Sequence, residues 1–200
     1  MNPLTDPAAI INYHRMMVGT YGPQSSLALG WRDMESQLVR FEALAGIADM
    51  SECSVLDTGC GYGDLLPYLT ARYGPLNYTG IEQIPEFLDE ANKRHGDQEH
   101  AVFINGNFAL IDLPKADYVL ASGSLNYHSE DPDFIFRVIA KLYSACRRGF
   151  AFNLLRAIVP NGLLVAYNSE KIMACCRSLC PNVKLVSDYA EEDFTIYMLR

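Results

Sequence analysis

The nine residues Val55-Leu56-Asp57-Thr58-Gly59-Cys60-Gly61-Tyr62-Gly63 constrain the fold of this chain more than any other stretch. An apolar pair leads into an acid and three alternating glycines, and the pattern after Asp64 predicts a helix. Glycine lets the backbone turn sharply and lets a ligand approach without a Cβ in the way. The following helix N-terminus offers free N–H groups and a positive dipole end. We therefore expect a strand, a glycine turn and a helix that form a site for a nucleotide-like cofactor.

The spacing of the glycines separates two kinds of cofactor site. A dinucleotide fingerprint reads G-x-G-x-x-G, and its third glycine allows close packing of the helix on the strand. Gly59, Gly61 and Gly63 read G-x-G-x-G instead, and Asp64 takes the place of the third dinucleotide glycine. The run from Asp57 to Gly63 resembles motif I of the class I S-adenosylmethionine-dependent methyltransferases. The resemblance implies that Asp57 and the three glycines bind S-adenosylmethionine, with S-adenosylhomocysteine as the product.

A second acidic residue ends the next expected strand, residues 76–82. The two oxygens of its carboxylate, on Glu82, can accept hydrogen bonds from both hydroxyls of a ribose. We therefore expect Glu82 to bind the cofactor ribose, with Gln83 beside it in the same site. A solvent-exposed Glu at a strand end is the alternative interpretation.

Residues 101–105 are the expected third strand, and Asn107 and Phe108 follow it closely. In the methyltransferases that this chain resembles, a polar residue here, often Asp, meets the adenine amino group, and its neighbour covers the ring. The resemblance assigns these roles to Asn107 and Phe108. Asn replaces the usual acid, but its side-chain carbonyl can still accept a hydrogen bond from an amino group.

The expected fourth strand ends at Ser122, which we assign to the cofactor site. Residues 123–128 then fall outside the carboxyl ends of the strands, where open α/β sheets bind their ligands. Asn126 and Tyr127 are candidates for substrate contact. His128 is a candidate general base because imidazole titrates near neutral pH, although a surface His at a helix start is the alternative. The Asp/Asn-Pro-Pro-aromatic motif of many amide and exocyclic-nitrogen methyltransferases is absent here, so that chemistry is not assigned.

Residues 1–48 are expected to form a helical cap or lid, and residues 50–200 the cofactor-binding core, of a single domain spanning 1–200. Prolines and glycines interrupt residues 1–30, whereas apolar spacing predicts a helix over 33–48 with Met34 and Leu38 on its buried face. Tyr21 is a candidate for substrate contact. Trp31 is a candidate for contact with the cofactor, and packing of its ring under a loop is the alternative.

The remaining pattern predicts further parallel strands and a closing hairpin. Asp131-Pro132 predicts a helix start, Arg147-Arg148-Gly149 its end, and residues 150–155 a fifth strand. Residues 183–189 and 194–199 alternate as two antiparallel strands, with helices expected between the first six strands. The resemblance, over residues 50–200, implies a three-layer Rossmann-like α/β fold. Its mostly parallel seven-stranded sheet has the order 3-2-1-4-5-7-6, with strand 7 antiparallel.

Composition limits the partners of the chain. The net charge is −8, and no Lys/Arg cluster exceeds the pair Arg147-Arg148, so we expect no nucleic-acid partner. The sequence has neither a basic and apolar leader nor a run of about 18 apolar residues, so we expect a cytoplasmic protein without a membrane partner. The six cysteines show no zinc spacing, and we expect no metal.

The expected reaction is methyl transfer from S-adenosylmethionine to an oxygen or nitrogen of a small molecule, because no extra domain offers surface for a macromolecule. Three alternatives remain open. A nicotinamide-dependent oxidoreductase is disfavoured by Asp64 and by the closing hairpin. An aminopropyltransferase needs a cluster of acids for polyamine cations, which the sequence does not present. A non-catalytic protein that binds an S-adenosyl ligand or a partner could share the same fold.

Overall fold

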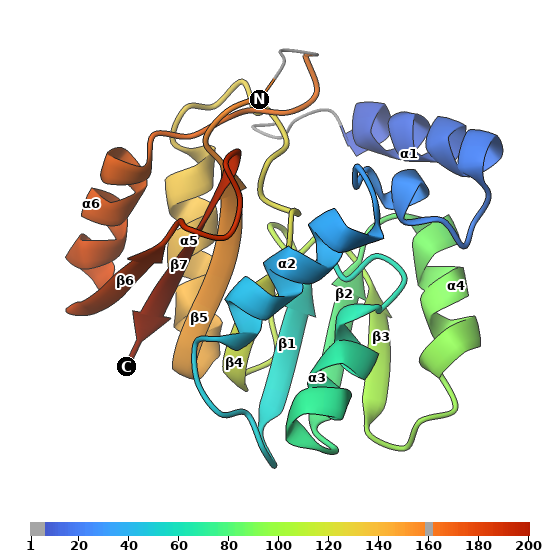
Figure 1. The fold of residues 1–200 in the computed structure, drawn as a ribbon, viewed down its shortest axis with the longest axis horizontal. Helices are drawn as coiled ribbons and strands as arrows, with labels where there is room; N and C mark the ends of the chain where they lie inside the picture. The colour runs from blue at the N-terminus through green and yellow to red at the C-terminus, as the bar shows by residue number, and fades with distance from the viewer. Residues whose placement is uncertain (1–6, 159–161) are drawn as a thin grey trace.

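The computed structural model describes residues 7–158 and 162–200. A seven-stranded sheet runs through the molecule in the order β3-β2-β1-β4-β5-β7-β6 (Figure 1). All pairs are parallel except those of β7, which is antiparallel to β5 and to β6. The predicted strand order is confirmed. The elements are α1 (Pro7–Tyr21), the 3-10 helix η1 (Ser26–Leu29), α2 (Met34–Ala45), β1 (Ser54–Thr58), α3 (Leu65–Tyr73), β2 (Asn77–Glu82), α4 (Pro85–His95), β3 (Ala101–Asn105), β4 (Ala116–Ala121), α5 (Phe134–Ala145), β5 (Cys146–Leu155), α6 (Ser169–Leu179), β6 (Asn182–Val186) and β7 (Asp193–Leu199).

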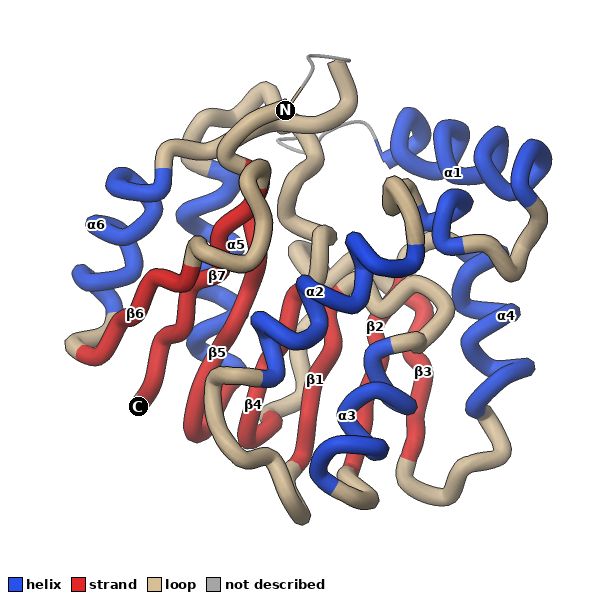
Figure 2. Tube along the Cα trace, in the orientation of Figure 1, coloured by secondary structure: helices blue, strands red, loops and turns tan. Residues whose placement is uncertain are grey.

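Helices cover both faces of the sheet. Phe41 of α2 and Leu69 of α3 pack in one buried cluster with strands β1 and β2. The ring of His95 on α4 stacks on Phe103 of β3, which borders the same cluster. Helices α5 and α6 pack together on the opposite face. Figure 2 shows loops gathered at the upper edge of the sheet, where the parallel strands end.

The expectation of a helix between every pair of the first six strands is wrong at one place. Residues 106–115, all within the described part of the chain, form turns and a loop between β3 and β4. Phe108, Ile111 and Leu113 pack from this loop onto the core cluster that α5 and α6 also cover. The side chain of Lys141 on α5 donates to the carbonyls of Ala109 and Ile111 and holds the loop in place.

The start of α5 lies later than Asp131-Pro132 predicted, at Phe134. The carboxylate of Asp131 accepts from the N–H of Asp133 at 2.9 Å and pairs with Arg137, so it closes a turn just before the helix. Strand β5 starts earlier than predicted, at Cys146, and includes the residues expected to end the helix. Sheet pairing with Ala116 of β4 extends the strand there. Similarly, β6 ends at Val186 rather than residue 189, at its last pairing with β7.

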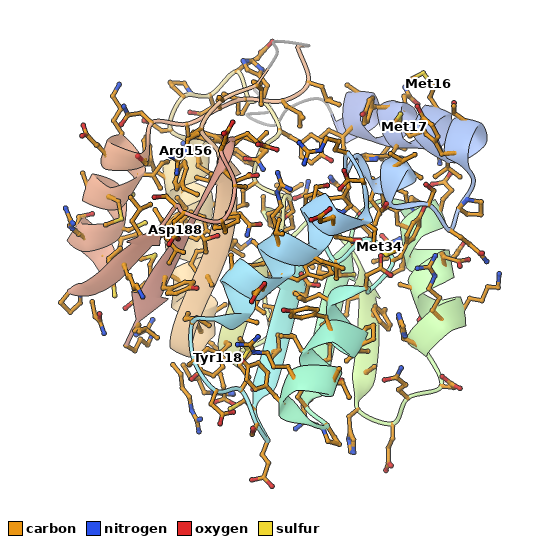
Figure 3. All side chains as sticks on the ribbon, viewed as in Figure 1. Met16, Met17, Met34, Tyr118, Arg156 and Asp188 are labelled. Carbon is orange, nitrogen blue, oxygen red and sulfur yellow. The ribbon has the colours of Figure 1, made fainter. Side chains whose placement is uncertain are left out.

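The first part of the chain is more regular than its prolines and glycines predicted. Helix α1 spans 15 residues, because Pro7 lies at its start and Gly22, with φ of 82°, follows its end. Figure 3 shows Met16 and Met17 on α1 at the edge of the molecule, and Met16 is exposed. Residues 1–6 lie outside the described part of the chain, as do 159–161 of the expected loop over 156–167.

Helix α2 belongs to the layer that packs on the sheet. The cap expected over residues 1–48 therefore has two parts, of which one is α1 with η1 and the other is the core helix α2. Asp33 caps α2 in a capping box with Ser36. The predicted buried face is wrong in part, since Met34 and Leu38 are exposed. Arg40 is buried instead, because its guanidinium pairs with the buried carboxylate of Asp193 on β7.

The pair of Arg40 and Asp193 provides a test of the packing between α2 and the sheet. We expect Arg40→Met to lower the free energy of unfolding by about 3–5 kcal/mol, because it leaves a buried carboxylate without its cation. The double variant Arg40→Met/Asp193→Asn should regain most of that loss. Urea denaturation measures both, and Arg137→Met, which removes an exposed ion pair, is the matched control with little effect. A small loss in Arg40→Met would contradict this account.

Candidate active site

A pocket opens at the carboxyl ends of β1, β2 and β4, beneath α1 and η1. Figure 1 shows α1 beyond the ends of β1, β2 and β3. Ten of the predicted site residues line this pocket: Trp31, Asp57, Gly59, Gly61, Glu82, Gln83, Phe108, Ser122, Asn126 and Tyr127. Four others lie outside its lining: Tyr21, Gly63, Asn107 and His128. The topology therefore gathers these residues from five separate segments of the chain at one edge of the sheet.

The glycine turn follows β1 with positive φ at Gly59 (77°) and Gly61 (56°). A Cβ on Gly59 would lie 2.4 Å from the Cβ of Ser124, and one on Gly61 would lie 2.8 Å from a methyl of Leu29. Gly63 also has positive φ, but a Cβ there would meet the ring of Phe103 at 2.9 Å. The first two glycines thus border the pocket, whereas the third lets the turn pack closely against Phe103 of β3 and His95 of α4.

Glu82 is buried at the end of β2, and its carboxylate is held by backbone N–H groups. Its Oε2 accepts from Gly61 at 2.9 Å, and its Oε1 accepts from Gln83 at 2.8 Å and from Ile84 at 2.9 Å. Burial raises the pKa of Glu82, while these three hydrogen bonds act in the opposite direction. The carboxylate therefore fixes the glycine turn against the end of β2 and still faces the pocket.

Asp57 is buried at the end of β1, and only one of its carboxylate oxygens has a hydrogen-bond partner within the described residues. Tyr78 donates its hydroxyl to Oδ2 at 2.5 Å, whereas Oδ1 has none. Burial raises the pKa of Asp57 to about 7; the Tyr78 hydrogen bond lowers it, and the charge of Glu82 raises it further. An acid in this state suits a cationic group of a ligand.

Ser122 and Asn107, two further residues predicted for the cofactor site, have different positions relative to the pocket. Ser122 lines the pocket, and its buried hydroxyl is likewise without a partner among the described residues. Asn107 lies behind Gln83, because its amide donates to Gln83 Oε1 at 2.9 Å and its carbonyl accepts from the N–H of Ala109. Gln83 and Phe108 then face the pocket in its place.

The residues predicted for substrate contact have separate environments. Asn126 lines the pocket, but its side chain accepts from the N–H of Leu155 at 2.9 Å and donates to the carbonyl of Gly123. Tyr21 is exposed at the end of α1. His128 is exposed, and its backbone N–H donates to the carbonyl of Leu163. The ring of Trp31 lies against Gly123, where a Cβ would come within 2.6 Å.

Sequence analysis did not single out His14, which the structure places in the pocket wall with only 2% of its surface exposed. Its Nδ1 lies 3.0 Å from the carbonyl oxygen of Ala28, and its Nε2 lies 2.5 Å from the hydroxyl of Tyr127. Burial lowers the pKa of His14, and the Ala28 hydrogen bond opposes that shift. The sequence signal was a histidine within an aromatic stretch of α1, but its partner lies far away in the chain.

Two kinds of feature are absent from the parts of the chain that the structure describes. Over residues 7–158 and 162–200, no three His, Cys, Asp or Glu side chains group together as metal ligands. In the same residues, no helix combines the length and the apolar character needed to cross a bilayer. All six cysteines are free thiols.

The fold and the pocket define a class of protein. A sheet in this order with an antiparallel β7, and with an acid–glycine turn at the end of β1, is the Rossmann-like architecture of class I methyltransferases. Magnesium protoporphyrin IX methyltransferase from Synechocystis PCC 6803, solved with bound S-adenosylhomocysteine, is similar at a TM-score of 0.72 and 14% identity, over 98% of this chain and all of that one. An O-methyltransferase family protein from Burkholderia thailandensis is similar at a TM-score of 0.72 and 15% identity, over 93% of this chain and 61% of that one.

Sequence comparison gives the family. Residues 56–149 match the methyltransferase domain family. The chain is 37% identical over 153 residues to Rv1506c of Mycobacterium tuberculosis (strain ATCC 25618 / H37Rv), a protein named as a methyltransferase, covering 72% of this chain and 90% of that protein. The chain belongs to the class I S-adenosylmethionine-dependent methyltransferases.

The raised pKa of Asp57 predicts how stability depends on pH. An Asp in the unfolded chain ionises near pH 4, whereas folded Asp57 ionises at about 7. The folded chain therefore keeps a proton that the unfolded chain has lost, and stability falls as pH rises through this window. We expect Asp57→Asn, which cannot ionise, to exceed the wild type in unfolding free energy by roughly 2–4 kcal/mol above pH 7 and by little near pH 4. Urea unfolding across this range measures the gap, and a gap that does not widen would contradict the assignment.

Proposed function

We propose that this pocket binds S-adenosylmethionine and directs its methyl group to an oxygen or nitrogen of a small molecule. The observation that carries the proposal is the pair of buried carboxylates, Asp57 and Glu82, on either side of the glycine turn. Oδ1 of Asp57 and the hydroxyl of Ser122, both buried and without partners among the described residues, suit the ammonium group of the cofactor's amino-acid part. Gly59 and Gly61 line the same pocket.

The other lining residues supply the remaining cofactor contacts of the proposal. Carboxylate oxygens have about four acceptor positions, so Glu82 can accept from ribose hydroxyls while it holds its three backbone N–H groups. Phe108 would cover the adenine ring and Gln83 would border it. Asn107 then acts behind Gln83, holding its side chain, rather than meeting adenine directly.

The bound cofactor supplies an electrophilic methyl carbon on a sulfonium. The chain's contribution is to hold the acceptor in line with that carbon, and orientation of this kind can lower a barrier by roughly 7–11 kcal/mol. Residues of α1 and η1 line one side of the pocket. The resemblance to a porphyrin methyltransferase and to an O-methyltransferase family protein supports a small-molecule acceptor.

Calorimetric titration with S-adenosylmethionine, S-adenosylhomocysteine and NAD in parallel tests the proposal. Binding of the two adenosyl ligands without NAD supports it. Binding of NAD alone would favour the oxidoreductase alternative. Binding of neither adenosyl ligand would overturn the assignment of this pocket.

The role of Glu82 gives a quantitative expectation. Glu82→Gln replaces one acceptor oxygen by an amide that cannot accept, so S-adenosylhomocysteine should bind about 1.5–3 kcal/mol more weakly. Glu86→Gln is the matched control, because Glu86 lies in the first turn of α4 and pairs with Arg15 outside the pocket. Calorimetry measures both variants, and an unchanged affinity in Glu82→Gln would remove this residue from the site.

The glycine turn allows a control that isolates ligand contact from backbone strain. Gly61 and Gly74 both have positive φ, and a Cβ on Gly74 would meet nothing within 4 Å. We expect Gly61→Ala to reduce affinity for S-adenosylhomocysteine at least tenfold, because its methyl would lie 2.8 Å from Leu29 and displace a side chain that lines the pocket. Gly74→Ala also places a side chain at positive φ but without such a contact, and it should leave affinity unchanged. Equal affinities in the two variants would mean that the turn does not contact the cofactor.

A further inference from the structure

His14 and Tyr127 meet in the pocket wall, although 113 positions separate them in the chain. A carbonyl oxygen can only accept, so His14 Nδ1 carries the hydrogen that it donates to Ala28. In the neutral ring, Nε2 therefore holds a lone pair, and the Tyr127 hydroxyl donates to it at 2.5 Å. This arrangement leaves the lone pairs of the Tyr127 oxygen available to accept a hydrogen bond from another molecule.

We propose, resting on the function proposed above, that the methyl acceptor is a neutral aromatic hydroxyl compound and that Tyr127 takes its proton. In this proposal Tyr127 is the catalytic residue, because its oxygen contacts the acceptor. His14 is the positioning residue, because it orients the Tyr127 hydroxyl and receives the proton that Tyr127 passes on.

Three other polar side chains of the pocket already make hydrogen bonds within the protein. Asn126 bonds to the backbone of residues 123 and 155, and Ser124 donates to the carbonyl of Thr58 at 2.6 Å. The amide of Gln37 donates to Asp64. Unlike these side chains, Tyr127 has an oxygen that can accept a further hydrogen bond and a neighbour, His14, that can take its proton.

The charges and walls of the pocket favour this class of acceptor. Asp57 and Glu82 are the charged residues among the described lining residues, and the lining includes no Lys or Arg. A carboxylate acceptor would therefore lack a cationic partner. Aromatic walls from Tyr13, Trp31 and Phe41 suit a flat ring. An amine attacks through its own lone pair and releases its proton afterwards, so it gains less from a base at the moment of attack.

The step balances in atoms and charge. As the acceptor oxygen bonds to the methyl carbon, the methyl–sulfur bond breaks and its electron pair stays on sulfur. The hydroxyl proton passes to the Tyr127 oxygen, and the Tyr127 proton passes to His14 Nε2. The sulfonium charge is lost as the imidazolium charge appears, so the net charge of the site is unchanged.

The two proton transfers occur in one step. Burial raises the pKa of the Tyr127 hydroxyl above that of a simple phenol, so Tyr127 gives its proton to His14 as it receives the proton of the acceptor and is not left as a tyrosinate. Burial lowers the pKa of His14, which keeps its ring neutral and ready to accept near pH 7. A positioned base typically contributes about 10²- to 10⁴-fold in rate.

The first test uses 4-nitrophenol, whose ionised form absorbs visible light, with the S-adenosylhomocysteine complex of the full chain. We expect a larger fraction of the bound probe to be ionised in the wild type than in Tyr127→Phe or His14→Gln at one slightly acidic pH. In Tyr127→Phe and in His14→Gln the bound probe should stay neutral, because the proton has nowhere to go. Tyr143→Phe on α5, outside the pocket lining, is the control. Equal ionisation of the bound probe in the wild type and in these two variants, or no binding, would overturn the proposal.

The second test compares turnover on matched phenols, anilines and benzoic acids. We expect the phenols to be methylated, with kcat for phenol itself lowered about 10²- to 10⁴-fold in Tyr127→Phe, at nearly constant KM. For 4-nitrophenol assayed in its ionised form, the loss should stay below about tenfold, because no proton needs to move. His14→Gln should show the same dependence on acceptor acidity, which a merely structural role would not produce.

The outcomes separate this inference from the proposed function. If the protein fails to bind S-adenosylmethionine, both the proposed function and the acceptor assignment are wrong. A protein that binds it but methylates the anilines or benzoic acids and not the phenols, or none of the three sets, overturns only the acceptor assignment. Equal losses in Tyr127→Phe for acidic and weakly acidic phenols would overturn the role of Tyr127.

Discussion

The site depends on one carboxylate that is held by the backbone. Glu82 receives hydrogen bonds from the N–H of Gly61 and from those of Gln83 and Ile84. Its oxygens thus join the turn after β1 to the segment after β2, two loops that share no direct sheet pairing. The N–H groups of Gly59 and Cys60 hold the start of the turn on the carbonyl of Ile81, and Glu82 fixes Gly61 beyond them. This matters because glycine loses more conformational entropy on folding than any other residue. The fold consequently places a buried charge where a ligand with hydroxyl groups can also use it.

The order of the sheet and the cofactor end of the site could be predicted from local patterns. A glycine turn after an apolar strand, an acid after the next strand and a closing hairpin each depend on a few neighbouring residues. Their spatial meeting then follows from parallel strands whose carboxyl ends share one edge. Gly63 and Asn107 show the limit of this reasoning, because motif position cannot tell whether a residue faces the ligand or the packing behind it.

The acceptor end could not be read from the sequence in the same way. His14 acquires its place only because α1 folds back over the strand ends and meets the segment after β4. His128, two positions beyond Asn126, carries the more obvious chemical signal but lies on the surface. The burial of Arg40 in the core was equally unpredictable, because it depends on Asp193 at the far end of the chain. Partners that lie this far apart in the chain produce no periodic pattern in a single sequence.

The unpartnered oxygen of Asp57 affects the heat that is measured when a ligand binds. Because its pKa lies at about 7, this carboxyl is partly protonated near neutral pH. A cation arriving beside it favours the ionised form, so binding expels part of a proton into the buffer. The heat of binding then contains the ionisation enthalpy of that buffer. Titrations in phosphate and in Tris at the same pH should therefore report different enthalpies for one and the same affinity.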